Sequence, residues 1–96
     1  MSPVRVAVGT IELHLPEAGS LKSKRHVLKG LKAKVKQRFE VAVAEVDHHD
    51  SWQRATVAVA CLSHDARHAN EVVSKAIDFI ESVVDGYIID VQVEIL

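Results

Sequence analysis

Several kinds of residue are scarce in this 96-residue sequence, and each scarcity excludes a class of protein. There is one cysteine, Cys61, so no disulfide can form within the chain, as is typical of proteins in a reducing cytosol. Aromatic residues make up only 4%, so the core must be built from Val, Ile, Leu and Ala. No apolar run approaches the ~20 residues of a membrane span, and the first residues lack a signal-peptide pattern. We therefore predict a cytoplasmic protein with no membrane partner.

Recognisable catalytic patterns are also missing. The sequence has no glycine-rich phosphate loop, and no nucleophile, base and orienting residue stand at a known spacing. The segment 47–50 (DHHD) contains two histidines, but no third ligand stands at the spacing of a zinc site. We predict no catalytic residues, no metal site and no cofactor, and we leave open whether the protein is an enzyme.

Acidic residues are absent from one strongly basic segment. Residues 20–39 (SLKSKRHVLKGLKAKVKQRF) hold eight of the twelve Lys and Arg residues and no Asp or Glu. The rest of the chain has four cations against thirteen acids, although the whole chain has a net charge of only −1. Such a separation of charge is typical of a protein with an anionic partner.

Hydropathy patterns predict a βαββαβ order of elements. Strands are expected over residues 4–15, 41–46, 54–62 and 87–96, one helix over the basic segment, and a second helix capped by Ser63 or Asp65. We expect Asp85-Gly86 to end that second helix, with a glycine that is able to take a positive φ. Right-handed connections then favour a single α+β domain over residues 1–96 with a ferredoxin-like fold. In this fold, two helices cover one face of a four-stranded antiparallel sheet of strand order 4-1-3-2.

Helical spacing separates an apolar face of the basic segment from a row of cations. The apolar face spans about 120° of arc and includes Leu28, Leu31 and Val35. Beside it lies what we call the basic stripe: Lys22, Arg25, Lys29, Lys32 and Lys36. A phosphate backbone suits such a row of cations. An ordinary solvated helix face is the alternative, although it would usually include acids for i,i+4 pairs.

We therefore predict a non-enzymatic protein that binds RNA or a ribonucleoprotein particle through this helix and the hairpin that joins the second and third strands. The predicted nucleic-acid-binding residues are Lys22, Lys24, Arg25, Lys29, Lys32, Lys36, His48, Trp52 and Arg54.

The same end of the sheet supports an alternative, a small acid–base enzyme acting on a phosphorylated substrate. Its candidate residues are His14, Glu45, His48 and Arg54. Glu45 is unusual because strand alternation places it on the apolar face of its strand. A carboxylate there needs Arg54 or a histidine as a partner, or a bulge that turns it outward.

The sheet face away from the helices is predicted to be smooth and weakly apolar. We expect Val4, Val6 and Val8 to face the helices, which leaves small residues on the opposite face: Ala7, Gly9, Ala42, Ala44, Ala58 and Ala60. Small side chains let two sheets approach closely, so a structural homodimer through this face is a third possibility.

Four segments of the chain resemble the YlxP-like family of small bacterial proteins. They are SLKSKRHVLKGLK (20–32), VAEVDHHDSWQRA (43–55), SHDARHANEVV (63–73) and DVQVEIL (90–96). The resemblance implies a ferredoxin-like fold and assigns no activity and no catalytic residues. The genes of this family often lie near those for translation initiation and ribosome maturation factors, which implies a role around RNA or the ribosome. His49 departs from the more usual Gln of the family, which weakens the metal interpretation further.

Overall fold

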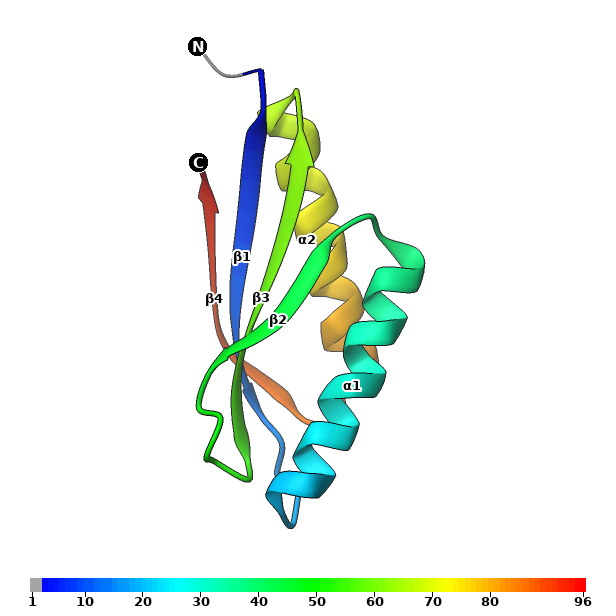
Figure 1. Ribbon diagram of the computed structural model, residues 1–96, viewed down its shortest axis with the longest axis vertical. Coiled ribbons are helices and arrows are strands. Elements are labelled where there is room, and N and C mark those ends of the chain that lie inside the picture. Colours follow the sequence, from blue (N-terminus) through cyan, green and yellow to red (C-terminus); the bar gives the residue numbers. More distant parts are fainter. Residues whose placement is uncertain (1–2) are drawn as a thin grey trace.

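The computed structural model describes residues 3–96, which form an elongated molecule of 47 × 22 × 18 Å (Figure 1). The elements are β1 (Arg5–His14), α1 (Leu21–Arg38), β2 (Ala42–Asp47), β3 (Arg54–Ser63), α2 (Ala66–Val83) and β4 (Tyr87–Ile95). The strands form one antiparallel sheet in the order β2-β3-β1-β4. The predicted ferredoxin-like α+β fold and its strand order are confirmed.

Both helices lie on one face of the sheet, and we call the other face the open face. In Figure 1, α2 runs behind β3 and to its right, whereas α1 lies beside β2 at the edge of the sheet. The core between the layers is aliphatic, with α2 contributing Ala69, Val73, Ala76, Ile77 and Ile80. Within residues 3–96, neither helix combines the length and apolar character that crossing a bilayer requires.

Side-chain caps fix where each helix begins. Ser20 and Ser23 form a reciprocal capping box at the start of α1, in which the Ser23 backbone N–H donates to Ser20 Oγ over 3.0 Å. Asp65, one of the two predicted caps, begins α2 by accepting from the Arg67 backbone N–H at 2.9 Å. Each side chain satisfies a backbone N–H that has no partner within the helix.

The prediction that Gly86 ends α2 through a positive φ is wrong. All four glycines of the chain have negative φ, and Val84 forms the C-cap of α2. Gly86 is needed instead for a close approach, because a Cβ there would collide with the backbone carbonyl oxygen of His14. The absence of a side chain lets the chain enter β4 directly beside the end of β1.

The predicted facing of β1 is also wrong. Ala7, Gly9, Ile11 and Leu13 are the buried residues of this strand, and Val6 and Val8 lie on the open face. The reason is that α2 crosses β1 at Gly9, where a Cβ would lie 2.9 Å from side-chain carbons of both Val73 and Ile77. A valine does not fit at this crossing, so the small residues of β1 face the helix.

The open face therefore differs in composition from the expected one. Ala42, Ala44, Ala58 and Ala60 lie on it as predicted, but Ala7 and Gly9 do not. Strand pairing adds larger neighbours, because Val6 is opposite Leu62 and Val8 is opposite Ala60. Far from the β2–β3 hairpin, the part of the open face formed by β2, β3 and β1 is consequently apolar and less smooth than predicted, and Glu94 of β4 borders it opposite Val8. We call this part the apolar half of the open face.

Candidate nucleic-acid interface

The basic stripe of α1 lies on the surface of the protein. Lys22, Arg25, Lys29 and Lys36 are exposed and Lys32 is half-buried. Within residues 3–96, none of the five side chains forms an ion pair. The first turn of α1 contains no acid that could balance them. The stripe is therefore a row of cations without ion-pair partners among the described residues.

The stripe faces away from α2. On the opposite side of α1, His26, Gly30 and Lys34 line a shallow pocket of about 220 Å³ together with the C-terminal end of α2. The stripe is centred roughly 180° from Val27 of that pocket, at ~100° per residue. The cations consequently border the β2 edge of the sheet, and α2 leaves them open to a partner.

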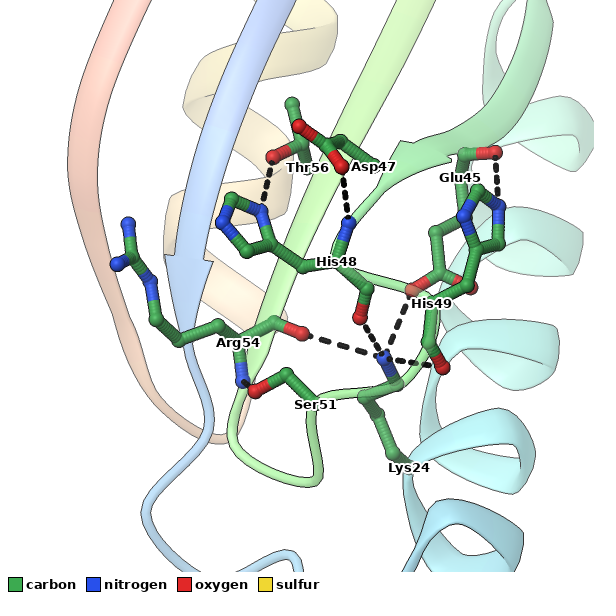
Figure 2. Close-up of polar contacts among 8 residues, drawn as sticks. All are labelled: Lys24, Glu45, Asp47, His48, His49, Ser51, Arg54 and Thr56. Carbon is green, nitrogen blue, oxygen red and sulfur yellow. Dashed lines mark hydrogen bonds and ion pairs between the residues drawn. The ribbon is translucent and has the colours of Figure 1, made fainter.

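Lys24 is the exception among the predicted binding residues, because its side chain is fully buried (0% exposed). Its Nζ donates to Glu45 Oε2 at 2.9 Å and to the carbonyl oxygens of His48 at 2.7 Å and Arg54 at 3.2 Å (Figure 2). A fourth acceptor, the carbonyl oxygen of His49, lies at 3.5 Å. We call this arrangement the Lys24 latch. We therefore remove Lys24 from the predicted nucleic-acid surface and assign it a structural role.

Helical spacing explains why Lys24 is inside. Lys24, Leu28, Leu31 and Val35 follow the i, i+4, i+7, i+11 pattern of the buried face of α1. Glu45 lies on the face of β2 that packs against α1. The ammonium of Lys24 and the carboxylate of Glu45 therefore meet as an ion pair within the apolar layer. A buried ammonium without partners would be costly. Here its hydrogen bonds are satisfied, and within residues 3–96 no buried side-chain N or O atom lacks a partner.

Glu45 therefore has a partner that the sequence analysis did not name. The predicted partners were Arg54 and the histidines, but the ion pair is with Lys24. A bulge does occur next to Glu45, between Glu45 and Asp47, yet it leaves Glu45 on the α1 side. It turns the following residues instead, so that Asp47 pairs with Thr56 on the open face.

The hairpin loop holds His48 in a special backbone conformation. His48 has a φ of 62°, in the left-handed region that residues other than glycine rarely adopt. Its backbone N–H donates to Asp47 Oδ1 at 2.7 Å, and its carbonyl oxygen accepts from Lys24 and from the Ser51 backbone N–H. These bonds maintain the conformation, which directs the imidazole toward the open face while the carbonyl points to α1 (Figure 2).

On the open face, a connected polar group lies at the hairpin end of the sheet. His48 Nδ1 is 2.9 Å from Thr56 Oγ1, and the Thr56 hydroxyl donates to Glu12 Oε1 at 3.2 Å. Arg54 Nη2 donates to the other oxygen of Glu12 at 2.8 Å. Two further residues extend the group across β1 and β4. We call the whole set the hairpin-end cluster: Glu12, His14, His48, Arg54, Thr56 and Tyr87.

The bonds of Thr56 define the tautomer of His48. The Thr56 hydroxyl donates its hydrogen bond to the Glu12 carboxylate, so its oxygen must accept from His48. Nδ1 therefore carries hydrogen, and in the neutral imidazole Nε2 keeps a lone pair. Since this nitrogen has no partner within residues 3–96, the neutral form of His48 presents a hydrogen-bond acceptor on the open face.

Aromatic rings stand at two places on this end of the molecule. The rings of His14 and Tyr87, from opposite residues of β1 and β4, are stacked with a centroid distance of 6.3 Å and an interplanar angle of 13°. Trp52, in the hairpin loop, is 56% exposed. Sequence analysis named Trp52 but missed Glu12, Thr56 and Tyr87. The β1–β3 register, which places Glu12 opposite Thr56 and His14 opposite Arg54, is the signal that could have found the first two.

The structure does not bring together the four residues of the predicted acid–base site. His14, His48 and Arg54 share the open face, whereas the side chain of Glu45 lies on the α1 side of the hairpin (Figure 2). The carboxylate that meets Arg54 is Glu12. The predicted catalytic grouping is therefore wrong in its carboxylate.

Other reactive groups form no site within residues 3–96. No three His, Cys, Asp or Glu side chains in this range are arranged to hold a metal ion. Burial, with a smaller contribution from Glu40, raises the pKa of the Cys61 thiol. This thiol consequently stays protonated at neutral pH and is a poor nucleophile.

Comparisons with known proteins agree with this description. Residues 6–93 match the family described as "Protein of unknown function (DUF503)". The chain is similar to the uncharacterized protein YlxP of Bacillus subtilis (strain 168), with 35% identity over 66 residues, 69% of this chain and 72% of the relative. Among solved structures it is similar to the de novo designed protein Ferredog-Diesel, with a TM-score of 0.50, 11% identity and coverage of 93% of this chain and 83% of that one. The designed protein supports the fold alone. The chain therefore belongs to the DUF503 family, and the predicted resemblance to YlxP-like proteins is confirmed.

Proposed function

We propose that this protein is a non-enzymatic RNA-binding domain of the cytosol that holds RNA, free or in a ribonucleoprotein particle, through the basic stripe and the hairpin end. The observation that carries the proposal is the uncompensated stripe, five cations on one side of α1 with no ion pair within residues 3–96. From Lys22 to Lys36 the stripe extends over about 21 Å of helix. Phosphates along a nucleic-acid strand would neutralise these cations and release counterions.

The alternative, a solvated helix face, fits α2 better than α1. On α2, Lys75 forms an i,i+4 ion pair with Glu71 at 3.1 Å, as is usual for exposed helical charges. On α1 no acid is available for such pairs, so neighbouring cations repel one another. A bound polyanion would remove this repulsion. RNA is preferred over DNA because of the translation-related gene neighbourhood that the YlxP-like resemblance implies.

The Lys24 latch supports a role for the hairpin end in the same interface. It binds the carbonyl groups of His48, His49 and Arg54 to the start of α1, where Lys22 and Arg25 also lie. The hairpin is therefore held beside the start of the stripe. The exposed indole of Trp52 adds a surface on which a base of a single strand can stack.

A matched pair of charge reversals tests the proposal. The double variant Lys29→Glu/Lys36→Glu should lose most of its affinity for single-stranded RNA at low salt. Arg67→Glu/Lys75→Glu, with the same change of charge on α2, should bind nearly as the wild type. For the wild type, log Kd against log salt should have a slope of magnitude about 3.5 if all five cations contact phosphates. Equal binding by both variants, or a flat salt titration, would contradict the proposal.

We also propose that a second copy of the chain covers the apolar half of the open face. Leu62 is 71% exposed there, and with Ala42 and Ala60 it borders a shallow depression of about 520 Å³ next to β2. Such a contact is self-complementary under two-fold symmetry. The wild type should sediment as a dimer at tens of micromolar, roughly where weak interfaces associate. Ala44→Glu/Ala58→Glu should give folded monomers, and a monomeric wild type would exclude this dimer.

A further inference from the structure

The hairpin-end cluster contains a pair of stacked rings, Tyr87 and His14, of which Tyr87 is exposed. Tyr87 stacks on His14 but remains 65% exposed, although it is the only tyrosine of the chain and lies on a strand. Its position is fixed because the preceding residue, Gly86, packs directly against the backbone of His14. An exposed aromatic ring held on a sheet surface is a typical stacking platform for an unpaired base.

The charges around the ring pair favour hydrogen-bond donors over phosphate. Asp90 is directly opposite Glu12 on the open face, and like charges in this position repel each other. Glu12 is bound by Arg54 and Thr56, but Asp90 forms no ion pair within residues 3–96. Asp47 lies on the same face. This end of the open face therefore carries one arginine, Arg54, and three carboxylates, those of Glu12, Asp47 and Asp90. A phosphate would be repelled here, whereas an N–H donor would relieve the repulsion.

Among the acceptors with unused capacity are the Asp90 carboxylate and, in neutral His48, Nε2. Exocyclic amino groups of nucleobases are the donors that carboxylates accept in base recognition, as with N4 of cytosine. Adenine, cytosine and guanine have such a group and uracil lacks it. The arrangement therefore combines a ring on which a base can stack with acceptors suited to its edge.

We infer that the hairpin-end cluster together with Asp90 binds an unpaired base that carries an exocyclic amino group, stacked on the Tyr87–His14 pair. The inference rests on the proposed function that the chain binds RNA. In this arrangement, the basic stripe binds phosphates and the hairpin end of the open face binds a base. The hairpin joins the two surfaces, because the latch binds its carbonyls to α1 while His48 faces the cluster.

Binding of three defined probes tests this site: oligocytidylate, oligouridylate and inorganic polyphosphate. The wild type should prefer oligocytidylate to oligouridylate. Tyr87→Leu should weaken oligocytidylate binding about tenfold, as expected for one lost stacking contact, and leave polyphosphate binding unchanged. Val93→Ala, at an exposed residue of the same strand on the helix side of the sheet, is the matched control. Asp90→Asn should reduce the preference for cytosine, and since Asp90 is exposed this variant is expected to fold.

The ring resonances of Tyr87 give a direct readout, because a single tyrosine is unambiguous in an NMR spectrum. They should shift with oligocytidylate and not with polyphosphate. If the wild type binds RNA with a steep salt dependence but Tyr87→Leu and Asp90→Asn leave affinity and base preference unchanged, the base site is wrong and the proposed function stands. If the wild type binds neither RNA nor polyphosphate, the proposed function fails and the base site fails with it.

Discussion

The two helices have the same length of 18 residues but use it differently. Five residues of α2 are buried, all of them apolar, beneath the centre of the sheet. Only three apolar residues of α1, Leu28, Leu31 and Val35, are buried, and the fourth buried residue is Lys24. α1 also carries cations without acids, whereas α2 mixes both signs. α2 therefore stabilises the sheet by apolar burial, while α1 keeps most of its surface for charge.

This difference explains why a buried ion pair occurs on the α1 side. A helix with few buried apolar side chains, set at the sheet edge, gains little from the hydrophobic effect. The Lys24 latch adds four oxygen contacts to two other segments, β2 and the hairpin loop with the start of β3. It therefore fixes the position and rotation of α1, and so the direction in which the basic stripe points.

The strongest test of the comparison removes the latch. Lys24→Ala removes the ammonium from the Glu45 carboxylate and from three carbonyl oxygens, of which that of His48 keeps its bond from Ser51, and should lower the free energy of unfolding by about 3–5 kcal/mol. Urea denaturation would measure the loss. Glu45→Gln added to Lys24→Ala should recover part of it, because the unpaired charge is then gone.

Lys75→Ala is the matched control for this experiment. It also breaks a lysine–glutamate pair on a helix, but both partners are exposed. Its effect should stay below about 0.5 kcal/mol. If Lys24→Ala were equally mild, the latch would not be what holds α1.

A smaller effect is expected where α2 meets the sheet. Gly9→Ala places a methyl group 2.9 Å from carbons of Val73 and Ile77. The two side chains must shift within a packed interface, so we expect a loss of about 1–3 kcal/mol in the free energy of unfolding. Thermal or urea unfolding would show it, and adding Val73→Ala should relieve part of the strain. A variant as stable as the wild type would mean that α2 packs more loosely than described.

The smallest expected effect is an increase in the free energy of unfolding, and it comes from a substitution on α1. Gly30 is in the middle of the helix, and nothing within 4 Å would meet a Cβ there. Gly30→Ala should therefore stabilise the protein by up to about 1 kcal/mol through helix propensity. A raised midpoint of urea denaturation would confirm this. A destabilised variant would show that the shallow pocket beside Gly30 is more crowded than the structure indicates.

The element order and sheet topology could be predicted because alternation, helical spacing and right-handed connections all agreed. The facing of β1 was misjudged from its first half, where both alternating sets are largely apolar, whereas in the second half Ile11 and Leu13 alternate with polar residues and carry the correct signal. What decided between them was the volume available under α2 at Gly9, which depends on how closely a distant helix packs. Hydropathy carries no information about that distance.

Part of the candidate site could have been predicted from the sequence. Lys24 stands at the centre of the apolar arc of its helix, and Glu45 stands on the apolar face of its strand, so the two could have been paired as opposite charges. The Tyr87–His14 ring pair was harder to predict from the sequence. It depends on the bulge in the β1–β4 pairing after Glu12, which brings Tyr87 opposite His14. Bulges of this kind leave little trace in a single sequence.

The Lys24 latch also bears on the order in which the protein folds. Its partners lie 21 to 30 residues further along the chain, and two of its carbonyl acceptors become adjacent only after the β2–β3 hairpin has turned. Short hairpins close at lower entropic cost than such longer connections. We therefore expect the hairpin to form first and α1 to dock late, with the ammonium losing its water only in the final step. Removal of the latch should then mainly accelerate unfolding and change the folding rate little.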